Sequence, residues 1–201
     1  MYNKLLKLQN LNQRKYVHGT LIVQGVMAEL VSSYGIVKNF KIRLFKPLYM
    51  LPIIHVDATS SEKPFISGSF EVDNTTIPFY LSESTEPCIQ YQIIDESSLE
   101  RGVKEIGDRY TVKLMPTDNI MVAWSAIERP CNFELFGRLG LRVPGKQMWF
   151  TRMELDNLDF LEHDIKSVGS SIAYNRLSEF CIQRKIYFND LLVGTRTAVY
   201  A

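Results

Sequence analysis

Residues Ile36–Val56 read IVKNFKIRLFKPLYMLPIIHV, and this stretch decides which kind of fold the chain can adopt. Its first half has the period-2 pattern of a strand buried on one face, because apolar and basic residues alternate over Phe40, Lys41, Ile42, Arg43 and Leu44. Its second half, Leu48–Val56, is almost continuously apolar. The stretch therefore predicts the middle of a sheet, with the remaining strands beside it or packed on it.

Strand-like segments recur on both sides of this stretch. Apolar alternation and β-branched residues predict strands at Tyr16–Gln24, Phe65–Val72, Thr76–Leu81, Cys88–Ile94, Tyr110–Met115, Ile120–Ile127, Asn132–Val143 and Gln147–Leu155. Asp73 and Asn74 separate two of these strands and predict the tip of a hairpin. The pattern of Val26–Tyr34 fits a helix or a strand.

Helical patterns are fewer and lie later in the chain. Ser97 and Glu100 form a capping box that predicts a short helix ending at Gly107. After Leu155 the apolar spacing changes, which predicts two helices over 158–169 and 172–181. The predicted fold class is α+β: a single domain with a mainly antiparallel sheet, sandwich-like or curved, one short mid-chain helix and a C-terminal helical pair.

The chain divides into three predicted segments of that one domain. They are an N-terminal amphipathic arm (1–15), a β-rich core (16–155), and a helical C-terminal segment with its tail (156–201), which packs on the same domain. The arm is expected to be a short helix or a segment that docks on a neighbour.

Composition places the chain among ordinary globular proteins. It has 201 residues, of which 46% are hydrophobic and 22% charged, and a formal net charge of +1. The overall charge therefore favours neither nucleic acid nor an acidic partner. The N-terminus lacks the apolar region of a signal peptide, and no segment is long enough to span a membrane. We expect a soluble intracellular protein or part of a virion, not secreted by a signal peptide and without membrane contact.

No motif predicts a catalytic residue, a cofactor or a metal site. Gly140–Gln147 resembles a phosphate-binding loop, but Gln147 replaces the hydroxyl residue that binds magnesium, and a strand follows it. The three cysteines, Cys88, Cys131 and Cys181, are far apart and predict buried reduced thiols. The three histidines are also isolated, and His55, in an apolar run, is interpreted as a core or interface residue.

Apolar residues near both termini suggest contacts with other subunits. The candidates are Leu5, Leu8 and Leu11 in the arm, and Tyr187, Phe188, Leu191 and Leu192 in the tail. Apolar terminal segments on a chain with no catalytic motif are typical of proteins that self-associate. The sequence thus favours a non-enzymatic structural or assembly protein, such as a virion, phage-tail, matrix or coat component, forming a homo-oligomer or docking on other protein subunits.

Two groups of basic residues support an alternative function. Lys38, Lys41, Arg43 and Lys46 surround the first predicted strand, and Arg138, Arg142, Lys146 and Arg152 lie on a later hairpin. If both groups share one face, they form a positive patch with aromatic residues available for base stacking. A nucleic-acid-binding module is therefore the alternative, and an enzyme with a dispersed site is the second alternative.

Overall fold

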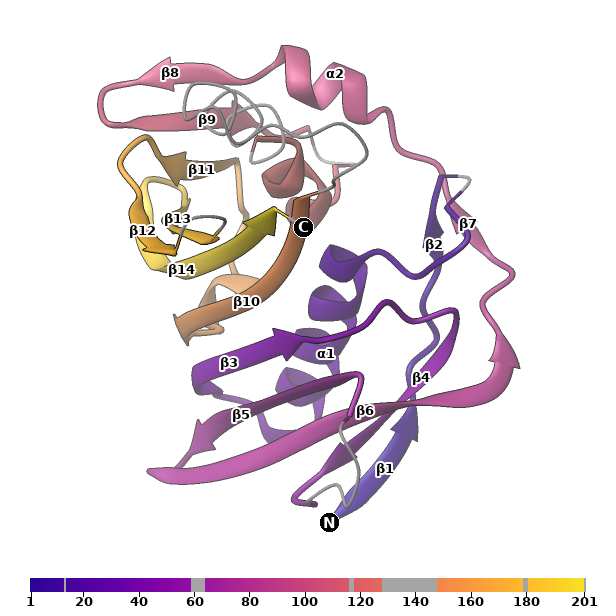
Figure 1. The fold of residues 1–201 in the computed structure, drawn as a ribbon. Helices are drawn as coiled ribbons and strands as arrows, with labels where there is room; N and C mark the ends of the chain where they lie inside the picture. Colours follow the sequence, from indigo (N-terminus) through magenta and orange to yellow (C-terminus); the bar gives the residue numbers. More distant parts are fainter. Residues whose placement is uncertain (13, 59–63, 116–117, 128–147, 179–180, 201) are drawn as a thin grey trace. The chain divides into compact units, whose positions relative to one another are not determined.

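The computed structural model describes residues 1–12, 14–58, 64–115, 118–127, 148–178 and 181–200. The chain forms two compact units. Unit one comprises Met1–Ile94 and Met153–His163, and unit two comprises Asp95–Arg152 and Asp164–Ala201. The described residues are mostly antiparallel strand, and each unit is considered by itself below (Figure 1).

In unit one a sheet packs against the long helix α1 (Gly19–Tyr34) (Figure 1). The sheet order is β1-β4-β6-β5-β3-β10, with β1 (Tyr2–Leu5), β3 (Lys38–Leu44), β4 (Met50–Val56), β5 (Ile66–Val72), β6 (Thr75–Pro87) and the second half of β10 (Met148–Asn157). The short strands β2 (Asn10–Leu11) and β7 (Tyr91–Gln92) pair in parallel beside it. A 3-10 helix, η1 (Asp159–Glu162), follows β10.

Alternation fixes which side of each strand meets the helix. In β4, Pro52, Ile54 and Val56 are buried, while the residues between them are half-buried. The inward side chains include Phe40 and Phe79, whose rings stack with centroids 6.0 Å apart. The odd-numbered residues of β4 therefore lie on the outward face of the sheet.

The hairpin between β5 and β6 turns at the predicted place. Asp73 and Asn74 have φ angles of 49° and 62°, which is the left-handed conformation that a two-residue hairpin turn requires. The predicted strands of Ile36–Val56 are also confirmed, as β3 and β4, and β4 lies inside the sheet between β1 and β6.

The strands of unit two belong to the same hydrogen-bonded strand order, which continues as β10-β14-β13-β11-β9-β8. These strands are β8 (Lys104–Ile106), β9 (Arg109–Lys113), β11 (Ser167–Ser171), β13 (Cys181–Phe188), β14 (Leu191–Tyr200) and the first half of β10, and β12 (Asn175–Ser178) pairs with β13. The short helix α2 (Glu96–Arg101) precedes β8. Its cap is the side chain of Asp95, which accepts a hydrogen bond from the Ser98 amide, so the cap is not Ser97.

The predicted C-terminal helical pair is wrong. The segments that it was expected to occupy contain η1, β11, β12 and the start of β13 instead. In β13 the inward residues Ile182, Arg184, Ile186 and Phe188 are buried at period 2, which is strand behaviour. Because the described residues are mostly antiparallel strand and contain no such helical pair, the predicted α+β fold class is wrong.

Helix occupies two places where strands were predicted. The segment Tyr16–Gln24 lies largely in α1, and residues 120–127 are helical. Six of the eight residues in 120–127 are buried, including Trp124, so the described part of this helix shows no polar face that would indicate a helical period. The Asn119 side chain caps it by accepting hydrogen bonds from the amides of Met121 and Val122, both at 3.1 Å.

Within the part of the chain that the structure describes, no helix is both long and apolar enough to cross a membrane.

Candidate active site

The outward face of the unit one sheet carries one row of polar side chains. The strand registers place Asn3 opposite His55, His55 opposite Tyr80, and Tyr80 opposite Ser67. Ser82 lies two residues beyond Tyr80 on β6 and so projects from the same face. Three strands that are distant in sequence thus bring an amide, an imidazole and a hydroxyl together.

These three groups form a hydrogen-bonded relay. His55 Nδ1 lies 2.9 Å from Asn3 Oδ1, and His55 Nε2 lies 2.8 Å from Ser82 Oγ. An amide oxygen only accepts hydrogen bonds, so the imidazole proton sits on Nδ1. Nε2 then carries the lone pair and accepts the hydrogen bond that the Ser82 hydroxyl donates. Ser82 can therefore act as a nucleophile, His55 as its base and Asn3 as the group that orients the base, which is the arrangement used in acyl transfer.

The surroundings of His55 hold the ring in place and keep it neutral. The ring stacks on Tyr80 with a centroid distance of 4.4 Å and an interplanar angle of 11°. Burial lowers the pKa of His55 below its ordinary value of 6.5. At neutral pH the imidazole is thus the free base, which is the form that can take a proton from a hydroxyl.

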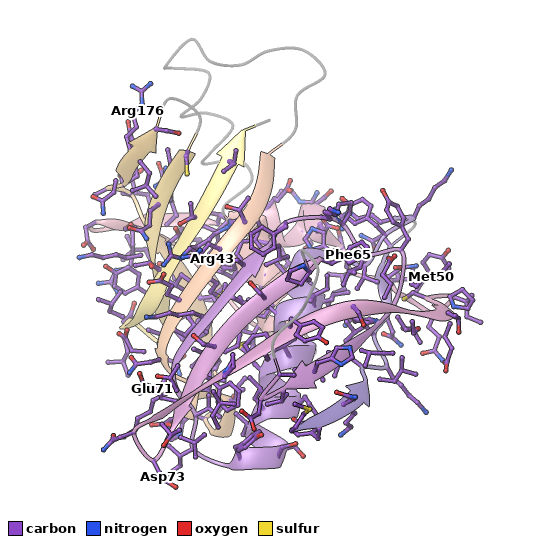
Figure 2. All side chains as sticks on the ribbon, turned by 60° about the horizontal axis from the view of Figure 1, so that its bottom comes forward. Arg43, Met50, Phe65, Glu71, Asp73 and Arg176 are labelled. Carbon is purple, nitrogen blue, oxygen red and sulfur yellow. The ribbon has the colours of Figure 1, made fainter. Side chains whose placement is uncertain are left out.

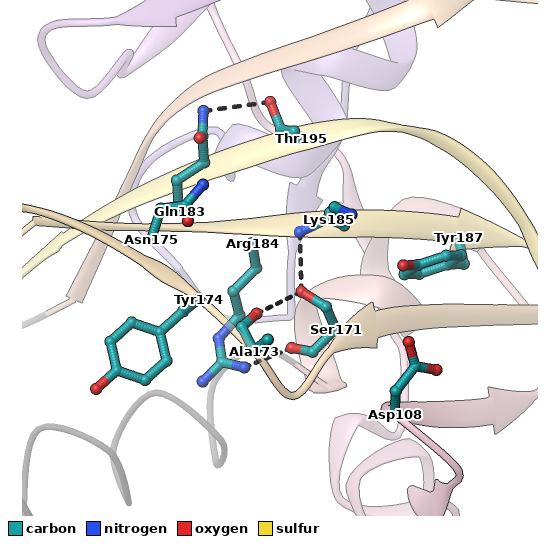
Figure 3. A pocket seen from close by; sticks show the side chains of 10 residues that line it. All are labelled: Asp108, Ser171, Ala173, Tyr174, Asn175, Gln183, Arg184, Lys185, Tyr187 and Thr195. Carbon is teal, nitrogen blue, oxygen red and sulfur yellow. Dashed lines mark hydrogen bonds between the residues drawn. The ribbon is translucent and has the colours of Figure 1, made fainter.

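Unit two contains a separate pocket of about 260 Å³ (Figure 3). Its lining combines charged, amide, hydroxyl and aromatic groups, namely Asp108, Ser171, Ala173, Tyr174, Asn175, Gln183, Arg184, Lys185, Tyr187 and Thr195. Most of these residues come from β13 and from the turn that follows β11.

The buried polar groups of this pocket hold its own walls together. Arg184 Nη1 donates hydrogen bonds to the carbonyls of Ser171, at 2.5 Å, and Ile172, at 2.8 Å. The Ser171 hydroxyl donates to the Ala173 carbonyl at 2.6 Å and accepts from the Lys185 amide at 3.0 Å (Figure 3). Within the described part of the chain no histidine lines this pocket, and the Ser171 hydroxyl stabilises the turn. The relay of unit one is therefore the stronger candidate for chemistry.

The apolar residues predicted as contacts differ in exposure. Leu11 and Phe188 are 1% and 2% exposed and belong to the core of the chain itself. Leu5, Leu8 and Tyr187 are half-buried, while Leu191 and Leu192, at the start of β14, are exposed. The two ends thus do not form uniformly exposed apolar segments within the described residues.

The predicted basic patch is described only in part. Lys38, Lys41, Arg43 and Lys46 are all exposed on or beside β3. Lys46 Nζ lies 5.5 Å from the centroid of the Phe65 ring. Arg152 lies on β10, and Arg138, Arg142 and Lys146 lie outside the described residues, as does the whole segment 140–147 that resembles a phosphate-binding loop.

The cysteines and acidic residues add no second site. Cys88 is buried and Cys181 half-buried, both as free thiols, and Cys131 lies outside the described residues. Burial raises the pKa of both described thiols, which keeps them protonated and poorly nucleophilic. Among the described residues, no group of three or more His, Cys, Asp or Glu side chains could hold a metal ion.

Comparisons with known proteins identify similar folds. No family model matches the sequence, and no curated protein matches it. The TesB protein of Mycobacterium avium subsp. paratuberculosis is 8% identical, with a TM-score of 0.48 over 96% of this chain and 91% of that one. The dehydratase domain from the CurJ module of curacin polyketide synthase is 12% identical, with a TM-score of 0.45 over 98% and 87%. An acyl-ACP thioesterase from Bacteroides thetaiotaomicron is 11% identical, with a TM-score of 0.41 over 99% and 96%.

These similar structures contradict the function predicted from sequence. They are hotdog-fold thioesterases and dehydratase domains, which are enzymes, and not virion or assembly proteins. The expectation of a non-enzymatic structural protein is therefore wrong, and the nucleic-acid alternative is not carried further. At such low identity the similarity concerns the fold alone, so the activity of this chain has to be sought in its own residues.

Proposed function

We propose that the chain is a serine hydrolase that cleaves activated esters or thioesters on the outward face of the unit one sheet. The single observation that carries this proposal is the Asn3–His55–Ser82 relay, with hydrogen bonds of 2.9 and 2.8 Å on the two sides of one imidazole. In this assignment Ser82 is the nucleophile, His55 the general base and acid, and Asn3 the positioning residue.

The reaction has two halves that use the same groups. Ser82 Oγ attacks the acyl carbon while its proton passes to His55 Nε2. The bond to the leaving group then breaks, and the alcohol or thiol departs with the proton from His55. Water attacks the acyl-serine, gives its proton to His55, and releases the carboxylic acid as Ser82 recovers its own proton.

The Asn3 amide has a specific role in this scheme. Because it accepts from Nδ1–H, it fixes the tautomer that leaves Nε2 free to act as the base. It also stabilises the imidazolium that forms during attack, although a neutral amide does so less than a carboxylate would. We therefore expect a modest hydrolase that favours esters with good leaving groups.

The test is hydrolysis of p-nitrophenyl acetate by purified protein, followed at the absorbance of nitrophenolate. Ser82→Ala and His55→Ala should each lower kcat/KM by about a hundredfold or more, the range seen when a general base is lost. Ser69→Ala is the matched control, because Ser69 lies on β5 of the same sheet and has no histidine partner in the relay. Equal activity in all four proteins would refute the proposal.

A second readout identifies the nucleophile directly. A fluorophosphonate forms a covalent phosphonate ester with an activated serine and releases fluoride. Intact-mass analysis should show one adduct per chain, mapped to Ser82 by peptide sequencing and absent from the His55→Ala protein. An adduct at another serine would overturn the assignment of Ser82.

A further inference from the structure

Ser82 lies in the middle of a row of apolar side chains. Ile53 is its cross-strand partner on β4, and Leu5 is the partner of Ile53 on β1. On the other side, β5 pairs Ile66 with Leu81, so the preceding residue, Phe65, lies beside Ser82. The Phe45 amide donates to the Phe65 carbonyl at 2.9 Å, which places Phe45 next in the row.

The row carries apolar side chains on the outward face of the sheet, and Lys46 Nζ lies 5.5 Å from the ring centroid of Phe65. Phe45 is 57% exposed, while Leu5, Ile53 and Phe65 are half-buried. Figure 2 shows Phe65 at the end of its hairpin that is remote from Glu71 and Asp73. We name the two aromatic members, Phe65 and Phe45, the acyl strip.

The position of His55 decides which side of Ser82 each part of the substrate occupies. His55 must protonate the leaving group, and it comes from β4. The leaving group therefore lies towards β4, and the acyl group extends the opposite way, over Phe65 and Phe45. Neighbouring strands are about 4.8 Å apart, so the two strands from Ser82 to Phe45 span about 10 Å, or about eight methylene carbons of extended chain.

We infer that the substrate acyl group is a medium-length aliphatic chain, of about eight carbons, that lies on the acyl strip. This inference rests on the proposed function, because it takes Ser82 as the point of attack. The inference adds a substrate class to the proposed function. Each methylene group that is buried against an apolar surface contributes favourably to binding, so the contribution grows with the length of the acyl chain.

The experiment compares p-nitrophenyl esters from acetate to dodecanoate. We expect kcat/KM to rise by about thirtyfold between acetate and octanoate, as partial burial of six methylene groups allows, and then to level off. Phe45→Ser should remove most of this rise, so that the octanoate and acetate esters are hydrolysed with similar kcat/KM. Tyr49→Ser is the control, because Tyr49 is a similarly exposed aromatic residue, at 55%, outside the strip.

The outcomes separate the two proposals. Ser82-dependent hydrolysis without chain-length preference, or a preference that survives Phe45→Ser, would overturn the acyl strip and leave the hydrolase intact. If no ester is hydrolysed, the hydrolase fails. In that case the acyl strip is tested separately, by measuring octanoate binding with titration calorimetry. The two proteins compared are Ser82→Ala and the double variant Ser82→Ala, Phe45→Ser. Equal octanoate affinity in the two proteins, or no binding in either, would refute it.

Discussion

Asn3 on β1 and His55 on β4 are direct cross-strand partners, and their side chains are joined by a hydrogen bond of 2.9 Å. The tautomer of the proposed base is thus set by the first strand of the chain, more than fifty residues away in sequence. In the proposed mechanism, pairing of β1 with β4 is consequently a condition for hydrolysis as well as a contribution to the sheet.

Replacement of Asn3 should affect catalysis more than folding. In Asn3→Ala the imidazole loses the acceptor that holds its proton on Nδ1, so we expect kcat to fall by about tenfold with little change in KM. Asn3→Asp should restore much of the rate, because a carboxylate accepts the same hydrogen bond. Steady-state kinetics on p-nitrophenyl acetate measures both. A loss in Asn3→Ala that Asn3→Asp does not rescue would contradict a positioning role.

The pH dependence of hydrolysis should report on His55. Only the neutral imidazole accepts the Ser82 proton, so kcat/KM should increase with pH and level off above the His55 pKa, which burial places below 6.5. Asn3→Asp should shift this midpoint upward, because the carboxylate stabilises the imidazolium. A rate profile with its midpoint above 6.5 in the unmodified protein would contradict the assigned environment.

The same pKa direction predicts how His55 affects stability. Between the lowered folded pKa and the ordinary value of 6.5, the unfolded chain binds more protons than the folded chain. The contribution of His55 to the free energy of unfolding is therefore complete above 6.5 and decreases as the pH falls through the folded pKa. Urea unfolding at several pH values measures this effect. As the pH falls, the free energy of unfolding should decrease less in His55→Gln than in the unmodified protein. Parallel pH profiles would exclude this contribution.

The inner face of β1 is tied to α1 by an ion pair. Lys4 Nζ lies 2.6 Å from Glu29 Oε2, and the Glu29 side chain is only 8% exposed. Ser33 also donates to Glu29 Oε1, at 3.0 Å. Lys4→Met should lower the free energy of unfolding by about 1–2 kcal/mol, because it leaves a largely buried carboxylate without its cation. Lys7→Met, at an exposed position of the same segment, is the control and should change stability little.

Local features of this fold could be predicted from the sequence, but partners distant in sequence could not. The β5–β6 hairpin was predictable because its turn lies within Asp73 and Asn74 themselves. Residues 120–127 and the segment after Leu155 were assigned wrongly for related reasons. Residues 120–127 are buried on most sides, so their sequence lacks the apolar-polar period of a surface helix. In β11 four consecutive residues are buried, so its sequence lacks the period-2 alternation of a half-buried strand.

The candidate site illustrates the same limit. Alternation within β4 could have placed His55 on the outward face, because Pro52, Ile54 and Val56 point inward. Nothing in the sequence pairs that residue with Asn3 or Ser82, since the relay depends on the registers of β1 and β6 against β4. A register set by the packing of a whole sheet is not contained in any one segment.

Substitution of Gly68 tests how closely β5 packs against β3 and against the Phe79 side chain of β6. A Cβ atom at this position would collide with the Lys41 carbonyl oxygen and with the Phe79 ring, and the first of these is backbone. Because neither strand can yield without shifting β3 against β5, Gly68→Ala should destabilise the protein by about 2–3 kcal/mol. Ser69→Ala, one residue further along β5, should cost much less. Urea unfolding measures both. Equal stability of the two variants would mean that β3 and β5 separate more easily than their paired register implies, and the apolar row between Phe45 and Ser82 would then lose its fixed geometry.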